Sequence, residues 1–80
     1  MNENILFYAF RYALGRMTYA VGEVANEIIR RAPDLSPGVR GAMIRDIDEA
    51  YSENRLGMEF DKSKWLEVRN VLGALVELNK

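Results

Sequence analysis

The sequence contains no cysteine and no histidine. A disulfide framework, a cysteine nucleophile and a zinc site of the usual Cys/His type are therefore excluded. The most common general base of enzymes is also missing, and no glycine is followed by the Lys-Ser/Thr pair of a phosphate-binding loop. We therefore expect a protein that is not an enzyme, with no catalytic, cofactor-binding or metal-binding residue.

An excess of charge of one sign is also lacking, because 11 basic residues face 12 acidic ones and the net charge is −1. General nucleic-acid binding needs many uncompensated basic residues, so nucleic acid is not the direct ligand we expect. The charge is unevenly distributed, since bases outnumber acids by two through Arg45 and acids outnumber bases by three from Asp46 onward. The second half is therefore the one expected to repel or mimic phosphate.

Long hydrophobic runs are absent as well. The opening "MNENILFYAF" has a short apolar run preceded by an acid, which fits neither a signal peptide nor a membrane span. We therefore expect a cytoplasmic protein without a membrane partner.

The hydrophobic residues that are present, 49% of the 80 residues, recur with helical spacing. The spacing predicts an all-α protein, a single domain over residues 1–80 built as a compact bundle of three to four short helices, each about 20 Å long. Steps of three and four place seven residues on one stripe of the first segment: Phe7, Phe10, Leu14, Met17, Val21, Val24 and Ile28.

Within this first segment, "LGRMT" allows two interpretations. Gly15 is typical of the position after a helix and Thr18 of an N-cap, which predicts two helices that meet there. The unbroken stripe instead predicts one long helix that tolerates a glycine. We favour the break.

The later helix boundaries follow from local signals. Pro33 ends the first segment, and Ser36 with Pro37 begins the next helix as N-cap and first residue. "SENRLG" ends that helix, and Asp61 is expected to cap the last one. The buried sides are predicted to be Val39, Met43, Ile47 and Ala50 or Tyr51 in the earlier helix, and Trp65, Val68, Leu72 and Leu75 in the last.

Three carboxylates, those of Asp46, Glu49 and Glu53, share one helix face because they are spaced by three and four residues. The segment "DIDEAYSEN" begins like a calcium loop, but it has no glycine at the sixth position, and Gly57 stands where a bidentate glutamate is required. Two interpretations remain: a solvated helix face, or an acidic patch that docks on a basic partner.

The opening segment carries a second candidate surface. On a continuous helix Tyr8, Tyr12 and Tyr19 lie opposite the hydrophobic stripe, with Arg11 and Arg16 at the two edges. Tyrosine and arginine dominate protein-binding hot spots and also stack on bases. Alternatively, this helix is buried on two sides and its tyrosines belong to the core. A break at Gly15 would remove Tyr19 from the surface.

At "FRYALGRMTY" the sequence resembles a group of small orphan proteins carried by phages and prophages, and the similarity continues through "EVANEII", "MIRDIDEA" and the region of Trp65. The resemblance implies an accessory protein without an assigned enzymatic activity, and it supplies no catalytic residue. It also implies a setting in the host-cell cytoplasm, where small phage proteins of this kind are often inhibitors of host machinery, including anti-CRISPR proteins.

The leading hypothesis is a phage accessory protein that inhibits a host-defence or nucleic-acid-handling complex by stoichiometric binding. The partner would be a host protein or ribonucleoprotein, plausibly a CRISPR effector, and homo-oligomers are possible. One alternative is a small DNA-binding regulator with a helix-turn-helix-like arrangement around "LSPGVRGAM", which the charge balance disfavours. The other is a structural or assembly subunit.

Overall fold

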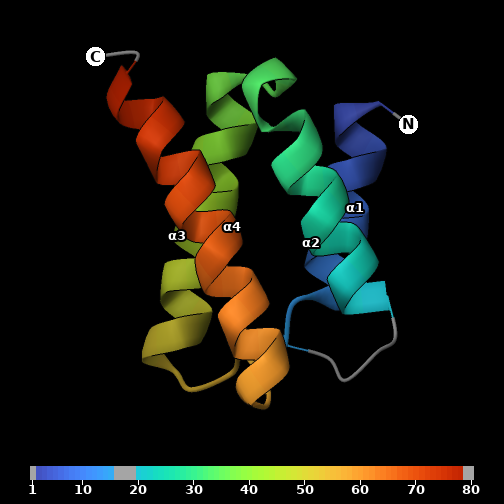
Figure 1. Cartoon of the computed structure of the whole chain (residues 1–80), viewed down its shortest axis with the longest axis vertical. Helices are drawn as coiled ribbons and strands as arrows, with labels where there is room; N and C mark the ends of the chain where they lie inside the picture. The colour runs from blue at the N-terminus through green and yellow to red at the C-terminus, as the bar shows by residue number, and fades with distance from the viewer. Residues whose placement is uncertain (1, 16–19, 79–80) are drawn as a thin grey trace.

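The fold is a bundle of α-helices without strands in the part of the chain that the computed structural model describes, residues 2–15 and 20–78 (Figure 1). This confirms the predicted all-α class. The elements are α1 (Glu3–Ala13), α2 (Ala20–Arg31), a short 3₁₀ helix η1 (Ala32–Asp34), α3 (Pro37–Ser52) and α4 (Glu59–Leu78).

The helices are arranged in two pairs, with α1 and α2 on one side of the bundle and α3 and α4 on the other (Figure 1). The main contacts join α3 to α4, α4 to α2, α2 to α1 and α1 to α3. The N-terminal end of α1 and the C-terminal end of α4 both lie at the top of Figure 1, and η1 joins α2 to α3 at the same end of the bundle. The connection between α3 and α4 lies at the opposite, lower end.

The break at Gly15 is confirmed. The side chain of Asn2 caps α1 by accepting a hydrogen bond from the Ile5 backbone N–H at 2.9 Å. The helix ends at Ala13, and Gly15 has a φ of +80°, in the left-handed region that favours glycine. Four residues of the predicted stripe, cap and surface lie outside the described residues: Arg16, Met17, Thr18 and Tyr19.

The start of α3 agrees with its sequence signals. Ser36 is the N-cap, its hydroxyl accepts a hydrogen bond from the Val39 N–H at 3.3 Å, and Pro37 is the first helical residue. Pro33 lies in η1, so α2 continues into one turn of 3₁₀ helix before the chain leaves the helical conformation.

The prediction that Asp61 caps the last helix is wrong. The helix α4 begins at Glu59, and Asp61 lies inside its first turn, where a carboxylate still complements the helix dipole. Helical hydrogen bonding reaches back to Met58, whose carbonyl accepts from the Lys62 N–H at 2.9 Å. The chain turns beforehand at Asn54 and Gly57, both of which have positive φ.

The core is centred on Trp65, which has no exposed surface and meets the edge of Phe10 at 5.5 Å between ring centroids. Val68 and Leu72 are fully buried beside it, as predicted. Of the two alternatives predicted near the end of α3, Ala50 is buried and Tyr51 is half exposed. Five predicted core residues are only partly buried at its edge: Phe7, Leu14, Val24, Val39 and Leu75.

Candidate functional site

The outer side of α1 is apolar and exposed. Ile5, Tyr8 and Tyr12 are spaced by three and four residues, so they form one ridge along the helix. Their exposed fractions are 52%, 71% and 64%, whereas the opposite side of α1 buries Leu6 and Phe10 completely. Large hydrophobic side chains that gather on one exposed helix side are typical of a binding surface.

The interpretation that places these tyrosines in the core is therefore wrong for Tyr8 and Tyr12. Each short helix needs to bury only one side, and in α1 that side is filled by Leu6 and Phe10. Tyr19 and Arg16, the other predicted members of this surface, lie outside the described residues. Ile5 belongs to the ridge and was missed by the sequence reasoning, although its spacing of three residues from Tyr8 is a usable signal.

Arg11 lies beside this ridge and is exposed. Its guanidinium stands 6.0 Å from the ring centroid of Phe7, the distance limit of a cation–π contact. Among the described residues it forms no ion pair with a carboxylate. Arg11 is thus a positively charged group next to two tyrosines.

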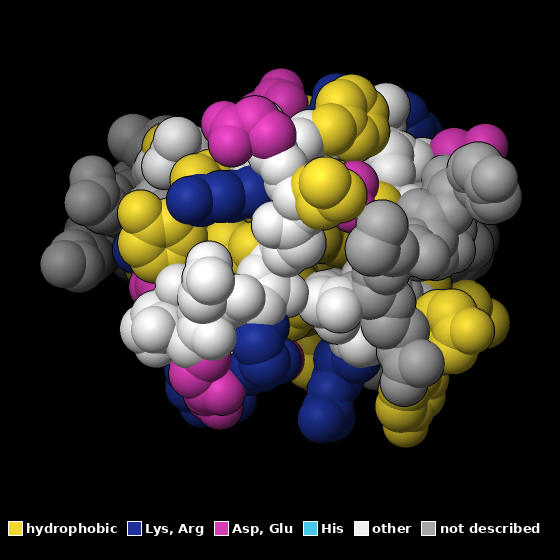
Figure 2. Space-filling model, turned by 90° about the horizontal axis from the view of Figure 1, so that it is seen from below, with side chains coloured by type: hydrophobic (Ala, Val, Ile, Leu, Met, Phe, Trp, Pro, Cys, Tyr) yellow, Lys and Arg dark blue, Asp and Glu magenta, His cyan; other side chains and the backbone are white. Residues whose placement is uncertain are grey.

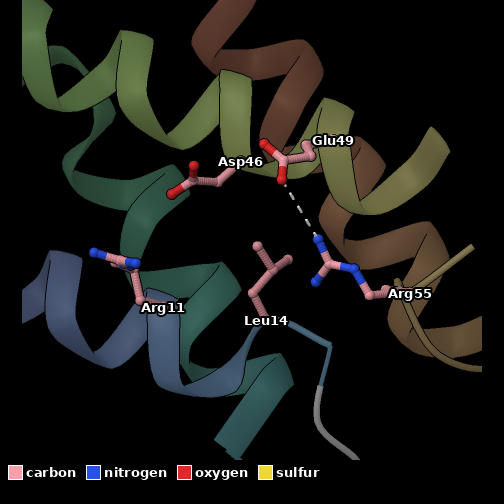
Figure 3. Close-up of a pocket in the computed structure, with 5 residues that line it drawn as sticks. All are labelled: Arg11, Leu14, Asp46, Glu49 and Arg55. Carbon is pink, nitrogen blue, oxygen red and sulfur yellow. Dashed lines mark ion pairs between the residues drawn. The ribbon is translucent and has the colours of Figure 1, made fainter. Parts of the chain in front are cut away.

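A hollow of about 190 Å³ opens between α1, α3 and the start of the α3–α4 connection (Figure 3). It is lined by Arg11, Leu14, Asp46, Glu49 and Arg55. In Figure 3 the two carboxylates extend from α3, and on the other side of the hollow Arg11 extends from α1 and Leu14 from the residue that follows it. The two candidate surfaces of the sequence analysis therefore meet here, because Arg11 belongs to one and Asp46 with Glu49 to the other.

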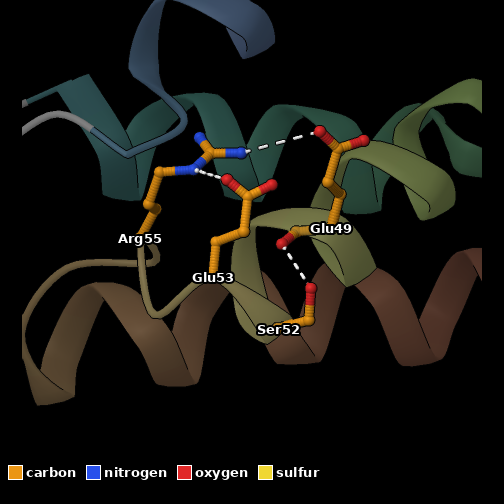
Figure 4. A network of polar contacts seen from close by, with 4 residues as sticks. All are labelled: Glu49, Ser52, Glu53 and Arg55. Atoms are coloured by element: carbon orange, nitrogen blue, oxygen red, sulfur yellow. Dashed lines mark hydrogen bonds and ion pairs between the residues drawn. The ribbon is translucent and has the colours of Figure 1, made fainter.

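The acidic residues around the hollow differ in their partners. Arg55 donates from Nε to Glu53 at 2.9 Å, and its Nη2 lies 4.0 Å from Glu49 (Figure 4). The hydrogen bond and the charge of Arg55 lower the pKa of the Glu53 carboxyl below its ordinary value. Asp46 is half-buried and makes no hydrogen bond or ion pair with any described residue. The acidic face is thus partly neutralised near its end.

Arg55 is a second residue of the candidate site that sequence reasoning missed. It follows α3 and lies in the turn, so no helical spacing relates it to Glu49. Only the backbone turn at Asn54, with a φ of 58°, brings the arginine back towards the carboxylates. A residue returned by a loop leaves no periodic signal in the sequence.

A second exposed apolar group lies at the lower end of the bundle. Met58 and Phe60 are 68% and 66% exposed, and Tyr51 packs under the Lys62 ammonium at 5.3 Å from its ring centroid. Figure 2 views this end and shows hydrophobic side chains interspersed with basic and acidic ones. It is more mixed in charge than the ridge on α1.

In the described parts of the chain no group of three or more acidic residues is placed to hold a metal ion. No helix of the described segments is long and apolar enough to cross a membrane. The hollow offers charged groups of both signs beside Leu14, and these charged groups can hold a polar group of a partner.

Comparisons of the chain with protein-family models, with curated proteins and with solved structures found no match.

Proposed function

We propose that the protein is a non-enzymatic phage or prophage accessory protein that acts by binding. Its partner is a host-defence or nucleic-acid-handling complex such as a CRISPR effector, and it inhibits this complex by covering a surface that the complex needs. The phage setting and the class of target rest on the sequence resemblance at "FRYALGRMTY".

One observation carries the binding role: the exposure of Tyr8 and Tyr12 on the same side of α1. A tyrosine that leaves its ring in water in the free protein gains apolar burial when a partner covers it. Tyrosine, together with arginine, is among the residues that contribute most to protein interfaces. Arg11, beside the ridge, adds a guanidinium that can pair with a partner carboxylate or phosphate.

The adjoining hollow supplies specificity. A partner that covers the ridge also covers Arg11, and Arg11 lines the hollow together with Asp46. Charged groups that are desolvated at an interface reject partners with the wrong charge at that position. The ridge therefore contributes affinity, and the hollow selects the partner.

The helix-turn-helix alternative is weakened by Arg40. This arginine belongs to "LSPGVRGAM", the segment that would approach DNA, yet it is only 4% exposed and its guanidinium bonds to backbone carbonyls of the chain. A buried arginine contributes nothing to phosphate contacts.

The experiment is capture of the partner from the bacterial host with the tagged chain. We compare the parent with Tyr8→Ala/Tyr12→Ala, and use Met58→Ala/Phe60→Ala as the matched control, since it removes two exposed apolar side chains from another surface. The parent and the control should retain the same stoichiometric partner, and the tyrosine variant should lose it while its circular dichroism is unchanged.

A partner held equally by all three proteins would show that the ridge on α1 is not the interface. Loss of the partner only in the Met58/Phe60 variant would transfer the function to the lower end of the bundle. The inhibitory role is checked by assaying the purified partner on its substrate with increasing amounts of the protein. A stoichiometric inhibitor abolishes the activity when protein and partner are present at a one-to-one ratio.

A further inference from the structure

Two opposite charges near the hollow have no counter-ion within the described chain. Arg11 on α1 and Asp46 on α3 line the same hollow, yet neither makes an ion pair with a described residue. The remaining basic group there, Arg55, is bonded to Glu53 and lies close to Glu49. The surface therefore presents one unpaired positive and one unpaired negative group side by side (Figure 3).

Such a pair makes a surface complementary to itself. Consider a two-fold axis that runs along this surface, midway between Arg11 and Asp46 and at right angles to the line joining them. This axis places Arg11 of each copy opposite Asp46 of the other copy. Each arginine then meets the aspartate of the other copy, and both contacts form at once. We propose that this α1–α3 surface is a two-fold interface, with a second copy of the chain as its occupant and two Arg11–Asp46 ion pairs across it.

The apolar ridge supports the same arrangement. The axis places α1 of each copy over α3 of the other. Tyr8 lies three residues before Arg11 and is the ridge residue nearest to it on α1, so the second copy removes its ring from water, whereas Ile5 and Tyr12 lie farther round the helix. Tyr8 offers on the order of 100 Å² of apolar surface per copy. A stable interface takes about 800 Å² per partner, so most of the contact comes from the rim of the hollow. We therefore expect a weak, reversible dimer.

No like charge on α1 opposes the incoming aspartate. The acidic residue in the first turn of α1 is Glu3, and its carboxylate accepts a hydrogen bond from the Ser36 N–H at 2.9 Å within the same chain. The exposed residues around the ridge on α1 are Asn2, Asn4 and Arg11. An approaching Asp46 therefore meets neutral or positive groups.

The test uses the chain alone and is sedimentation equilibrium between about 10 µM and 1 mM, the range of weak association. We expect the mass of the parent to rise from 9.2 kDa towards twice that value. Arg11→Glu places two glutamates against two aspartates, and Asp46→Lys places two lysines against two arginines. Each single variant should therefore remain a monomer throughout the range.

Mixing the two variants gives the decisive measurement. In a mixed dimer the glutamate introduced into one chain faces the lysine introduced into the other. At the second contact the native Asp46 faces the native Arg11, so both contacts are attractive again. An equimolar mixture of Arg11→Glu and Asp46→Lys should therefore recover the dimer mass. An effect within one chain, such as altered folding, cannot produce this recovery.

Two reversals elsewhere serve as controls. Arg30→Glu lies at the end of α2 and Asp48→Lys on the side of α3 that faces α4, and both should dimerise like the parent. A parent mass of 9.2 kDa at every concentration overturns the proposal. So does a dimer that survives both single reversals, or a mixture that stays monomeric. A second copy and the host partner cover overlapping surfaces and therefore exclude each other, so capture of the host partner is measured separately with the tyrosine variants, below the concentration at which the chain dimerises.

Discussion

The two ends of α3 use their charged side chains in opposite ways. At the beginning of the helix, Arg40 is buried and its Nη1 donates to the carbonyls of Leu35 at 2.6 Å and Ala32 at 3.2 Å. Towards the other end, Asp46 borders a hollow without any described partner, and Glu49 has Arg55 only at 4.0 Å.

The difference separates charge used for folding from charge available for binding. The last carbonyls of a helix lack partners within the helix. Arg40 supplies donors to the carbonyls around η1, so it fixes the path from α2 to α3. No backbone group near Asp46 needs a donor or acceptor of that kind, and its carboxylate stays available to a ligand.

The largest expected effect compares two leucines, one in the packed part of the bundle and one at the hollow. Leu72→Ala should lower the free energy of unfolding by about 2–5 kcal/mol, because Leu72 is fully buried. Leu14→Ala should cost less than half of that loss, because Leu14 is only partly buried and water already reaches the hollow it lines. Urea denaturation followed by circular dichroism measures both. Equal losses would mean that the hollow is packed like the core.

The next effect compares the two arginines directly. Arg40→Met keeps the apolar stem but leaves buried carbonyls without their donor, so it should cost about 1.5–3 kcal/mol. Arg11→Met, at the exposed ridge, should change stability by no more than about 0.5 kcal/mol. The same denaturation experiment applies. If the two substitutions cost the same, the contrast between the ends of α3 is wrong.

A smaller effect concerns the turn that shapes the hollow. Gly15 has a φ of +80°, and a Cβ there would stand 3.0 Å from the carbonyl oxygen of Arg55. Gly15→Ala should therefore destabilise by about 1–2 kcal/mol. Gly41→Ala is the control, because it lies within α3 and nothing beyond the adjoining helix backbone lies within 4 Å of the added Cβ, and it should stabilise by about 0.5–1 kcal/mol. Shifts of Tm with the same sign would contradict this account.

Much of the fold was predictable because its signals are local. Ser36 and Pro37 begin α3 as their side chains require, and the helical spacing identifies Trp65 and Leu72 as buried. Asp61 misled the prediction because a carboxylate is favourable both as a cap and within the first turn. Sequence alone does not distinguish these two positions.

The candidate site was predictable only in its parts. The sequence identified Tyr8, Tyr12 and the carboxylates of Asp46 and Glu49, each from spacing within one helix. That Arg11 and Asp46 line one hollow depends on how α1 packs against α3, which no spacing within a single helix reports. The pairing of Arg55 with Glu53 depends on a turn, and it was missed for the same reason.

The smallest expected effect concerns the charge pair next to the hollow. The hydrogen bond and charge of Arg55 hold the pKa of Glu53 below its ordinary value of 4.5. A carboxyl whose pKa is lowered in the folded state stabilises that state at a pH above the ordinary pKa. This contribution is lost as the pH falls through the lowered pKa. Both side chains of the pair are about half exposed, so its effect on stability is small, and the titration of the carboxyl itself is the sharper measurement.

Arg55→Gln should therefore raise the pKa of Glu53 towards 4.5. The measurement is the chemical shift of the Glu53 side-chain carboxyl carbon between about pH 2 and 7. The control is Arg30→Gln, which removes the arginine that lowers the pKa of Glu27 by the same kind of hydrogen bond on α2. It should raise the pKa of Glu27 and leave that of Glu53 unchanged. If Glu53 titrates identically with and without Arg55, the arginine is not bound to the end of α3. Its charge would then be available to the hollow, and Glu53 would not be neutralised at the end of the acidic face.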